Sequence, residues 1–116
     1  MDTLTNDYEI KLDELHSVAY LSGSLRLHSP NAYETPFLSI TDYIKDLTAD
    51  QKFTINLADL DFLNSSGVTS IAKIVLLARS QNINLNIVCN NEIPWQEKTI
   101  SSFNKLYNKV DIQFNS

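Results

Sequence analysis

The chain has 116 residues, and its 9 Lys and Arg against 14 Asp and Glu give a formal net charge of -5. One cysteine and two histidines are too few for a disulfide framework or a Cys/His zinc site, and two glycines are too few for a G-x-G-x-x-G dinucleotide turn. The acidic balance, with no run of Lys or Arg, argues against nucleic-acid binding, which needs basic side chains to neutralise phosphates. We therefore expect one domain, residues 1–116, with no metal and no cofactor.

The sequence shows no sign of a membrane or secretory segment. Its longest apolar stretches fall far short of the ~20 residues that cross a bilayer, and residues 1–15 lack the basic and then apolar regions of a signal peptide. We expect a cytoplasmic protein without membrane contact. It follows that Asn64-Ser65-Ser66, although spaced like a glycosylation sequon, should carry no glycan.

The first half of the chain predicts two strands and a helix. Apolar and polar residues alternate over 8–12 and, after a turn, again over 18–27, as in half-buried strands. Thr35 followed by Pro36 is typical of a helix N-terminus, and apolar residues at helical spacing over 37–47 predict the helix itself.

The second half alternates strands with helices. Residues 53–57 predict a third strand, residues 59–63 its exit loop, and Asn64 or Ser65 the cap of a second helix that runs to about Arg79. The remaining expected elements are a strand over 85–89, a helix opened by Pro94, and a strand over 110–114. This order, β-β-α-β-α-β-α-β, is typical of a single α/β domain with a central mixed sheet.

Several segments resemble one known family. The segment 56–75, NLADLDFLNSSGVTSIAKIV, looks like the phosphoacceptor region of STAS domains, the bacterial anti-sigma-factor antagonists: an apolar strand, a turn ending in Ser-Ser-Gly, and an apolar helix. Residues 21–25 are similar to the glycine-bearing second strand of that family, and the order of elements matches along nearly the whole chain. Residues 94–96, Pro-Trp-Gln, resemble a cyanobacterial-type subgroup. Asn64 and Arg26 stand where the family usually has Asp.

The resemblance implies a non-catalytic regulatory protein that is switched by phosphorylation. Its partners would be a kinase-type anti-sigma factor, or a related signalling kinase, and a serine phosphatase. The resemblance places the phosphate on Ser65, with Ser66 as the second choice. A phosphate adds about -1.5 to -2 charges, and the first turn of a helix favours an anion by roughly 0.3 to 1 kcal/mol. We therefore expect the fold to tolerate the phosphate, which would act on a docked partner.

The residues around Ser65 form a predicted partner-binding surface. A helical wheel places a face without acidic residues opposite the apolar stripe of the second helix, with Leu77 in the middle of that face. We expect Gly67 to let another backbone approach the serine. The complete predicted surface is Arg26, Asp61, Asn64, Ser66, Gly67, Thr69, Ser70, Lys73 and Leu77.

Other interpretations stay open on the residues alone. The Ser-Ser-Gly turn could simply cap a helix, and a STAS module that is never phosphorylated would be a constitutive adaptor or a small-ligand binder. A small serine hydrolase could be imagined from Ser65, His28 and Asp61, although the G-x-S-x-G nucleophile elbow is absent. Asp59 and Asp61 lack a third metal ligand and are expected to be loop carboxylates. Cys89 is expected to be buried in a strand.

Overall fold

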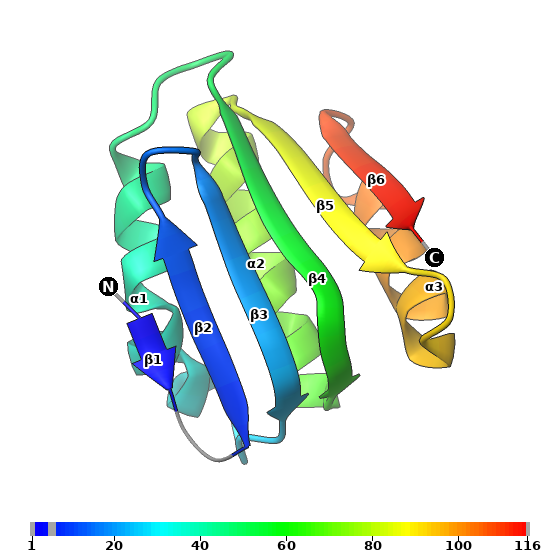
Figure 1. Cartoon of the computed structure of the whole chain (residues 1–116). Coiled ribbons are helices and arrows are strands. Elements are labelled where there is room, and N and C mark those ends of the chain that lie inside the picture. Colours follow the sequence, from blue (N-terminus) through cyan, green and yellow to red (C-terminus); the bar gives the residue numbers. More distant parts are fainter. Residues whose placement is uncertain (1, 5–6, 116) are drawn as a thin grey trace.

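The computed structural model describes residues 2–4 and 7–115, which form a six-stranded sheet with three α-helices (Figure 1). The strands are β1 (Asp2–Leu4), β2 (Tyr8–Asp13), β3 (Val18–Leu25), β4 (Lys52–Leu63), β5 (Asn84–Asn90) and β6 (Val110–Asn115). The helices are α1 (Glu34–Lys45), α2 (Ser65–Gln81) and α3 (Pro94–Ile100), with 3₁₀ turns η1 (Pro30–Tyr33) and η2 (Ser101–Lys105) beside α1 and α3. Within the described ranges, no helix has the length and apolar character needed to cross a membrane.

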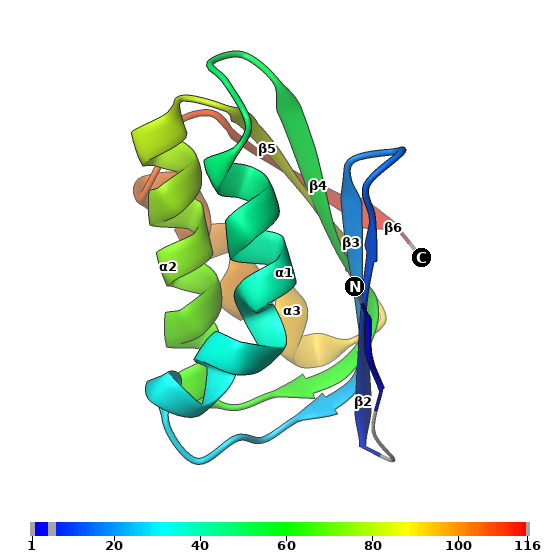
Figure 2. The same cartoon turned by 90° about the vertical axis from the view of Figure 1, so that its left-hand side faces the viewer.

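The strands lie in the sheet in the order in which they occur in the chain. The pairs β1–β2 and β2–β3 are antiparallel, and the pairs β3–β4, β4–β5 and β5–β6 are parallel. The two strands of each parallel pair are joined through a helix by a right-handed crossover. Because each crossover moves to the next strand in the same direction across the sheet, all the helices lie on one face. Figure 2 shows α1, α2 and α3 on that face and no helix of the described chain on the other. The predicted α/β fold with a mixed sheet is confirmed.

Strand alternation decides which face is apolar. In β5 the fully buried Leu85, Ile87 and Cys89 alternate with half-buried Asn84 and Asn86. The buried set faces the helices, whose own apolar residues close the core. The core therefore lies entirely on the helical side of the sheet, and the other face is polar.

The start of α1 differs from the predicted one. The predicted Thr35 cap is wrong, because the hydroxyl oxygen of Ser29 accepts the backbone N–H of Ala32 at 3.3 Å and caps η1, which runs directly into α1. Ser29 and Pro30 carry the same Ser/Thr-Pro pattern six residues earlier in the chain. Pro36 is tolerated in the first turn of α1, where backbone N–H groups need no intrahelical acceptor.

β1 and the length of β4 also differ from the prediction. β1 pairs with β2 at the edge of the sheet, although its three residues are too few to show an alternating pattern. β4 continues to pair with β3 as far as Leu63, whereas its pairing with β5 ends at Asn56. Two β-bulges in the β3 pairing bend this outer half of β4. Asp59 and Asp61 therefore lie in a strand and not in the expected loop.

Gln96 of α3 fills the gap where β4 leaves β5. Its side chain is fully buried, and Nε2 donates to the carbonyl oxygens of Leu57 at 2.7 Å and Leu60 at 2.9 Å. Its Oε1 accepts the N–H of Asn90 at 2.8 Å. Where β4 and β5 diverge, they can no longer hydrogen bond to each other. The Gln96 side chain therefore supplies the hydrogen-bond partners of three backbone groups there.

Replacing Gln96 with leucine should lower the free energy of unfolding by about 2 to 4 kcal/mol. The Gln96→Leu variant keeps the volume but leaves these backbone groups without partners, and each unsatisfied buried group costs about 1–3 kcal/mol. Urea denaturation followed by circular dichroism measures the loss. Gln113→Leu, at an exposed position of β6, is the matched control and should change stability by less than about 0.5 kcal/mol. Equal losses in the two variants would contradict the role of Gln96.

Candidate functional site

The junction between β4 and α2 is organised by Asn64. Its Oδ1 accepts the N–H of Gly67 at 2.9 Å and the hydroxyl of Tyr33 at 2.7 Å, while its Nδ2 donates to the carbonyl oxygen of Leu27 at 2.7 Å. Of the two capping residues that the sequence allows, Asn64 is therefore the cap, and Ser65 is the first residue of α2. A single amide connects η1, the chain after β3, and α2.

Tyr33 and Gly67 set the spacing beneath this junction. Tyr33 is 1% exposed, and its hydroxyl also accepts the N–H of Leu27 at 3.3 Å. Burial raises the pKa of the Tyr33 phenol, so that the proton donated to Asn64 is retained. A Cβ at Gly67 would lie 2.8 Å from the Tyr33 oxygen and closer still to Cδ1 of Leu63. Gly67 therefore makes room for two side chains of this chain, and not for another backbone as the sequence predicts.

The acid that STAS domains usually carry should not fit at position 64. We expect Asn64→Asp to lower the free energy of unfolding by about 1 to 2 kcal/mol. A carboxylate cannot donate a hydrogen bond to the Leu27 carbonyl oxygen, and a buried carbonyl left without a donor costs about 1–3 kcal/mol. The favourable interaction of the negative charge with the N-terminus of α2 offsets only about 0.3–1 kcal/mol of this cost. Thermal and urea denaturation test this against Asn31→Asp, the same change at an exposed position of η1. A variant at position 64 as stable as the parent would contradict this use of the amide.

Ser65 is the more accessible of the two serines. Its side chain is exposed, whereas that of Ser66 is half-buried, and no described residue forms a hydrogen bond with the Ser65 hydroxyl. The backbone N–H groups of Ser65 and Ser66 lie in the first turn of α2, where no carbonyl of the helix can accept them. A phosphate attached to the Ser65 oxygen would therefore lie beside N–H groups that have no acceptor within the helix, and beside the positive end of the helix dipole.

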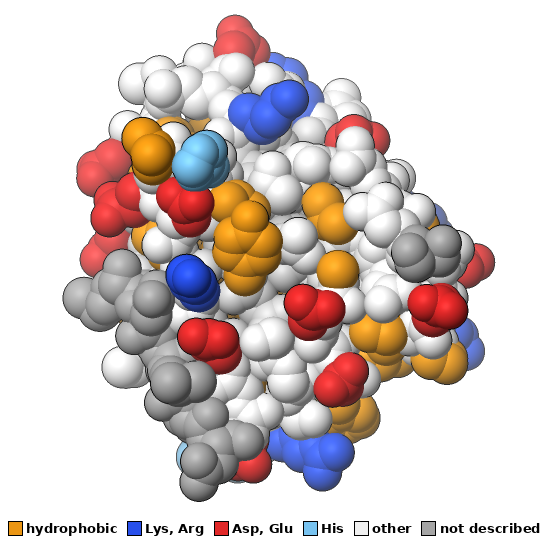
Figure 3. Space-filling model, in the orientation of Figure 1, with side chains coloured by type: hydrophobic (Ala, Val, Ile, Leu, Met, Phe, Trp, Pro, Cys, Tyr) orange, Lys and Arg blue, Asp and Glu red, His pale blue; other side chains and the backbone are white. Residues whose placement is uncertain are grey.

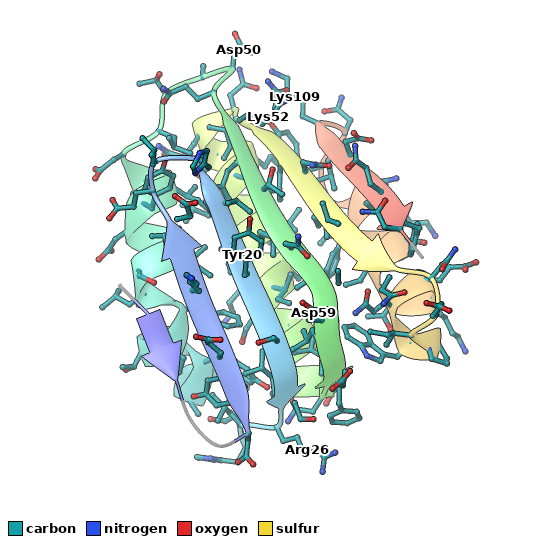
Figure 4. All side chains as sticks on the ribbon, in the orientation of Figure 1. Tyr20, Arg26, Asp50, Lys52, Asp59 and Lys109 are labelled. Atoms are coloured by element: carbon teal, nitrogen blue, oxygen red, sulfur yellow. The ribbon has the colours of Figure 1, made fainter. Side chains whose placement is uncertain are left out.

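Arg26 and Phe62 lie beside the junction. The backbone N–H of Asn64 donates to the carbonyl oxygen of Leu25 at 3.1 Å, which places the chain at Arg26 next to Ser65. The Arg26 guanidinium carbon is 4.6 Å from the centroid of the Phe62 ring, a cation–π contact. Figure 4 shows Arg26 at the end of β3, pointing away from the sheet. Arg26 is thus held close to the junction by an aromatic ring.

The exposed face of α2 is rotated from the predicted one. Thr69 and Lys73 are exposed as expected, but Ser70 is 6% exposed and its hydroxyl donates to the carbonyl oxygen of Ser66 at 2.9 Å. The exposed leucine is Leu76, at 44%, whereas Leu77 packs against the core. The cause is α1, which packs beside α2 and covers the side that carries Ser70.

The residues of the other interpretations are not brought together. His28 is exposed, and neither Ser65 nor Asp61 is hydrogen bonded to it in the part of the chain that the structure describes. The main-chain oxygen of Asp61 accepts the indole N–H of Trp95 at 2.8 Å, which ties α3 to β4. In the same described ranges, no three His, Cys, Asp or Glu side chains group as metal ligands would. Cys89 is fully buried as predicted, and burial raises the pKa of its thiol to about 12.

This fold is similar to that of solved structures of SiaC from Pseudomonas aeruginosa. The crystal structure of apo-SiaC matches with a TM-score of 0.71 at 13% identity, over 100% of this chain and 99% of that one. A second structure of SiaC matches with a TM-score of 0.65 at 15% identity, over 98% and 93% of the two chains.

The crystal structure of the diguanylate cyclase SiaD in complex with its activator SiaC matches with a TM-score of 0.72 at 16% identity, over 99% of each chain. No protein-family model and no curated protein matches the sequence. At identities this low, the likeness is one of fold along the whole chain.

Proposed function

We propose that this chain is a non-catalytic regulatory protein with a STAS-like fold, which binds a signalling enzyme at the β4–α2 junction and is switched by phosphorylation of Ser65. The observation that carries the proposal is the exposed Ser65 hydroxyl at the first residue of α2, in a segment that resembles the STAS phosphoacceptor region. The likeness to SiaC supports the regulatory role, because SiaC is an activator bound to an enzyme in its complex with SiaD.

The local chemistry favours an effect on the partner rather than on the fold. Ser65 is exposed, so a phosphate on it needs no rearrangement of the core. The free N–H groups of the first turn stabilise the added charge by roughly 0.3 to 1 kcal/mol. A partner that packs against the Ser65 hydroxyl would have to bury that charge, which costs far more. Phosphorylation would therefore release the partner and leave the domain folded.

The proposed contact surface follows the exposed residues of the junction together with the half-buried Ser66. It comprises Ser65, Ser66, Thr69, Lys73 and Leu76 of α2, together with Arg26 and Asp61. The residues beneath this surface, which hold it in place by hydrogen bonding or packing, are Asn64, Gly67, Ser70 and Leu77.

Two classes of enzyme are candidates for the partner. The STAS resemblance favours a kinase-type anti-sigma factor or a related kinase, opposed by a serine phosphatase. The likeness to SiaC in its complex with SiaD favours a diguanylate cyclase instead. A constitutive adaptor is the alternative function, and it is favoured by Asn64, whose amide occupies the place of the usual acid.

Purification of the tagged chain from its native cell tests the proposal. Peptide mass spectrometry should find a phosphate on Ser65 in part of the population, and the protein that co-elutes identifies the class of enzyme. The same purification of Ser65→Ala should retain the partner and lack the phosphate. A chain that is unmodified under all growth conditions, yet co-purifies with a partner, would replace the switch by the constitutive adaptor.

A further inference from the structure

The sheet face opposite the helices is uncovered in the described part of the chain (Figure 2). Its side chains on β4, β5 and β6 are mostly polar and uncharged, among them Thr54, Asn56, Asn84, Asn86 and Gln113. Figure 3, which views this face, shows it largely white, with separate acidic side chains around an orange group. Most of the face is suited to contact with water, so a local departure from this composition is informative.

A hollow on this face lies over β2, β3 and β4, with Ser22 as its floor. In the sheet register Ser22 lies between Glu9 of β2 and Asp59 of β4. Neighbouring strands are about 4.8 Å apart, so the backbones that carry these two carboxylates are about 10 Å apart, with a small side chain between them. Tyr20 lies two residues along β3 and is 44% exposed. Figure 4 shows Tyr20 over β3 and Asp59 over β4 on the same face.

The charges around the hollow are mainly negative. Glu9, Asp13, Glu14 and Asp59 line it, against the single cation Lys11. Asp13 is paired with the exposed His16 ring at 2.7 Å. No described residue forms an ion pair with the other three carboxylates. The hollow therefore combines three carboxylates that form no ion pair within the described chain with an aromatic ring that is open to solvent.

We propose that this hollow is a second docking surface, which takes an arginine-bearing segment of a partner protein. A guanidinium stacks on an aromatic face, is weakly hydrated, and donates in a fork that matches a carboxylate. Placed on the Tyr20 ring, above Ser22, it meets Glu9 on one side and Asp59 on the other. The hollow and α2 lie on opposite faces of the sheet, so this surface and Ser65 can be occupied at the same time. The inference does not depend on phosphorylation.

Titration with a short basic peptide tests this surface directly. Blocked tetra-arginine, added to ¹⁵N-labelled full-length chain, should shift the amide signals of residues 9–13, 20–22 and 56–59 and leave those of α1 unchanged. Tyr20→Ser and Asp59→Asn should each weaken binding at least about tenfold. Tetra-lysine should bind at least about threefold more weakly, because it brings charge without a stacking plane.

Matched controls separate a built site from general attraction to an acidic protein. Asp42→Asn removes the same charge from the exposed face of α1, and Leu38→Ser removes an exposed apolar side chain there; both should leave the affinity unchanged. Losses equal to those of the hollow variants would overturn the proposal. Self-association of the chain in sedimentation that Tyr20→Ser abolishes would assign the face to a second copy and overturn it as well. Ser65→Asp should leave peptide binding intact, so the two proposals can fail separately.

Discussion

Ser65→Asp should weaken binding of the native partner at least about a hundredfold, whereas Ser65→Ala should weaken it less than about tenfold. If the partner packs against the exposed hydroxyl, the aspartate becomes a buried and unpaired charge, which costs several kcal/mol, and about 2.7 kcal/mol already corresponds to a hundredfold change in affinity. Removing a hydroxyl that no described residue uses costs little. Isothermal titration calorimetry with the partner obtained by co-purification measures both changes.

Arg26 should moderate this effect. Its guanidinium lies beside the junction on the Phe62 ring, from which it could pair with a new acid at position 65 and reduce the cost of the charge. Arg26→Asp, which introduces the acid that STAS domains usually have there, should therefore widen the difference between the Ala and Asp variants of Ser65. Equal affinities for those two variants in both Arg26 backgrounds would rule out the switch and support the constitutive adaptor.

Gly23→Ala should cause the largest loss of stability among the single substitutions considered, about 2 to 5 kcal/mol. Gly23 has a φ of +85°, a conformation that costs other residues about 1–2 kcal/mol. An added Cβ would also collide with the carbonyl oxygen of Asp7 and lie 2.9 Å from Cα of Tyr8. Both atoms belong to backbone that pairs with β3, including the Ser24 N–H bond to Asp7 at 2.8 Å, so relief requires opening the β2–β3 ladder.

Urea denaturation compares this variant with Ser24→Ala, a small substitution at the next residue of the same strand, which should cost less than about 1 kcal/mol. Gly23→Asn separates the two causes, because asparagine tolerates a positive φ better than alanine but brings the same Cβ. Gly23→Asn should therefore be more stable than Gly23→Ala only by the cost of the positive φ, and should keep the loss caused by the collision of the Cβ with the backbone of Asp7 and Tyr8. A Gly23→Ala variant as stable as the Ser24→Ala control would contradict the close approach of β2.

The order of the strands and α-helices from β2 onward and the cap of α2 could be predicted because both are local properties. Alternation over Tyr8–Asp13 and Asn84–Asn90 and helical spacing after Asn64 each indicate one element without reference to the rest of the chain. The polar cap was also visible, since an Asx or Ser residue before an apolar helical pattern has few other uses. Ser65 at the helix start follows from the same pattern.

What could not be predicted depends on contacts between distant segments. The buried stripe of α2 includes Ser70 because α1 packs on that side, and no periodicity within α2 can reveal this. The outer half of β4 is a strand because β3 pairs with it on one side. On the other side, where β5 has ended its pairing, Gln96 donates hydrogen bonds to the carbonyl oxygens of Leu57 and Leu60. The use of the Asn64 amide depends on the carbonyl oxygen of Leu27, 37 residues away in the sequence, which accepts its Nδ2 hydrogen bond.

The buried Tyr33 hydroxyl also links the junction to alkaline pH. The pKa of Tyr33 is raised above its ordinary value of 10.0, chiefly because burial disfavours the phenolate. Above pH 10 the unfolded chain releases this proton while the folded chain keeps it, so folding is progressively opposed until the folded pKa is reached. Ionisation there also removes the donor to Asn64, so the strand-to-helix turn that presents Ser65 should be among the first parts of the domain to loosen in strong base.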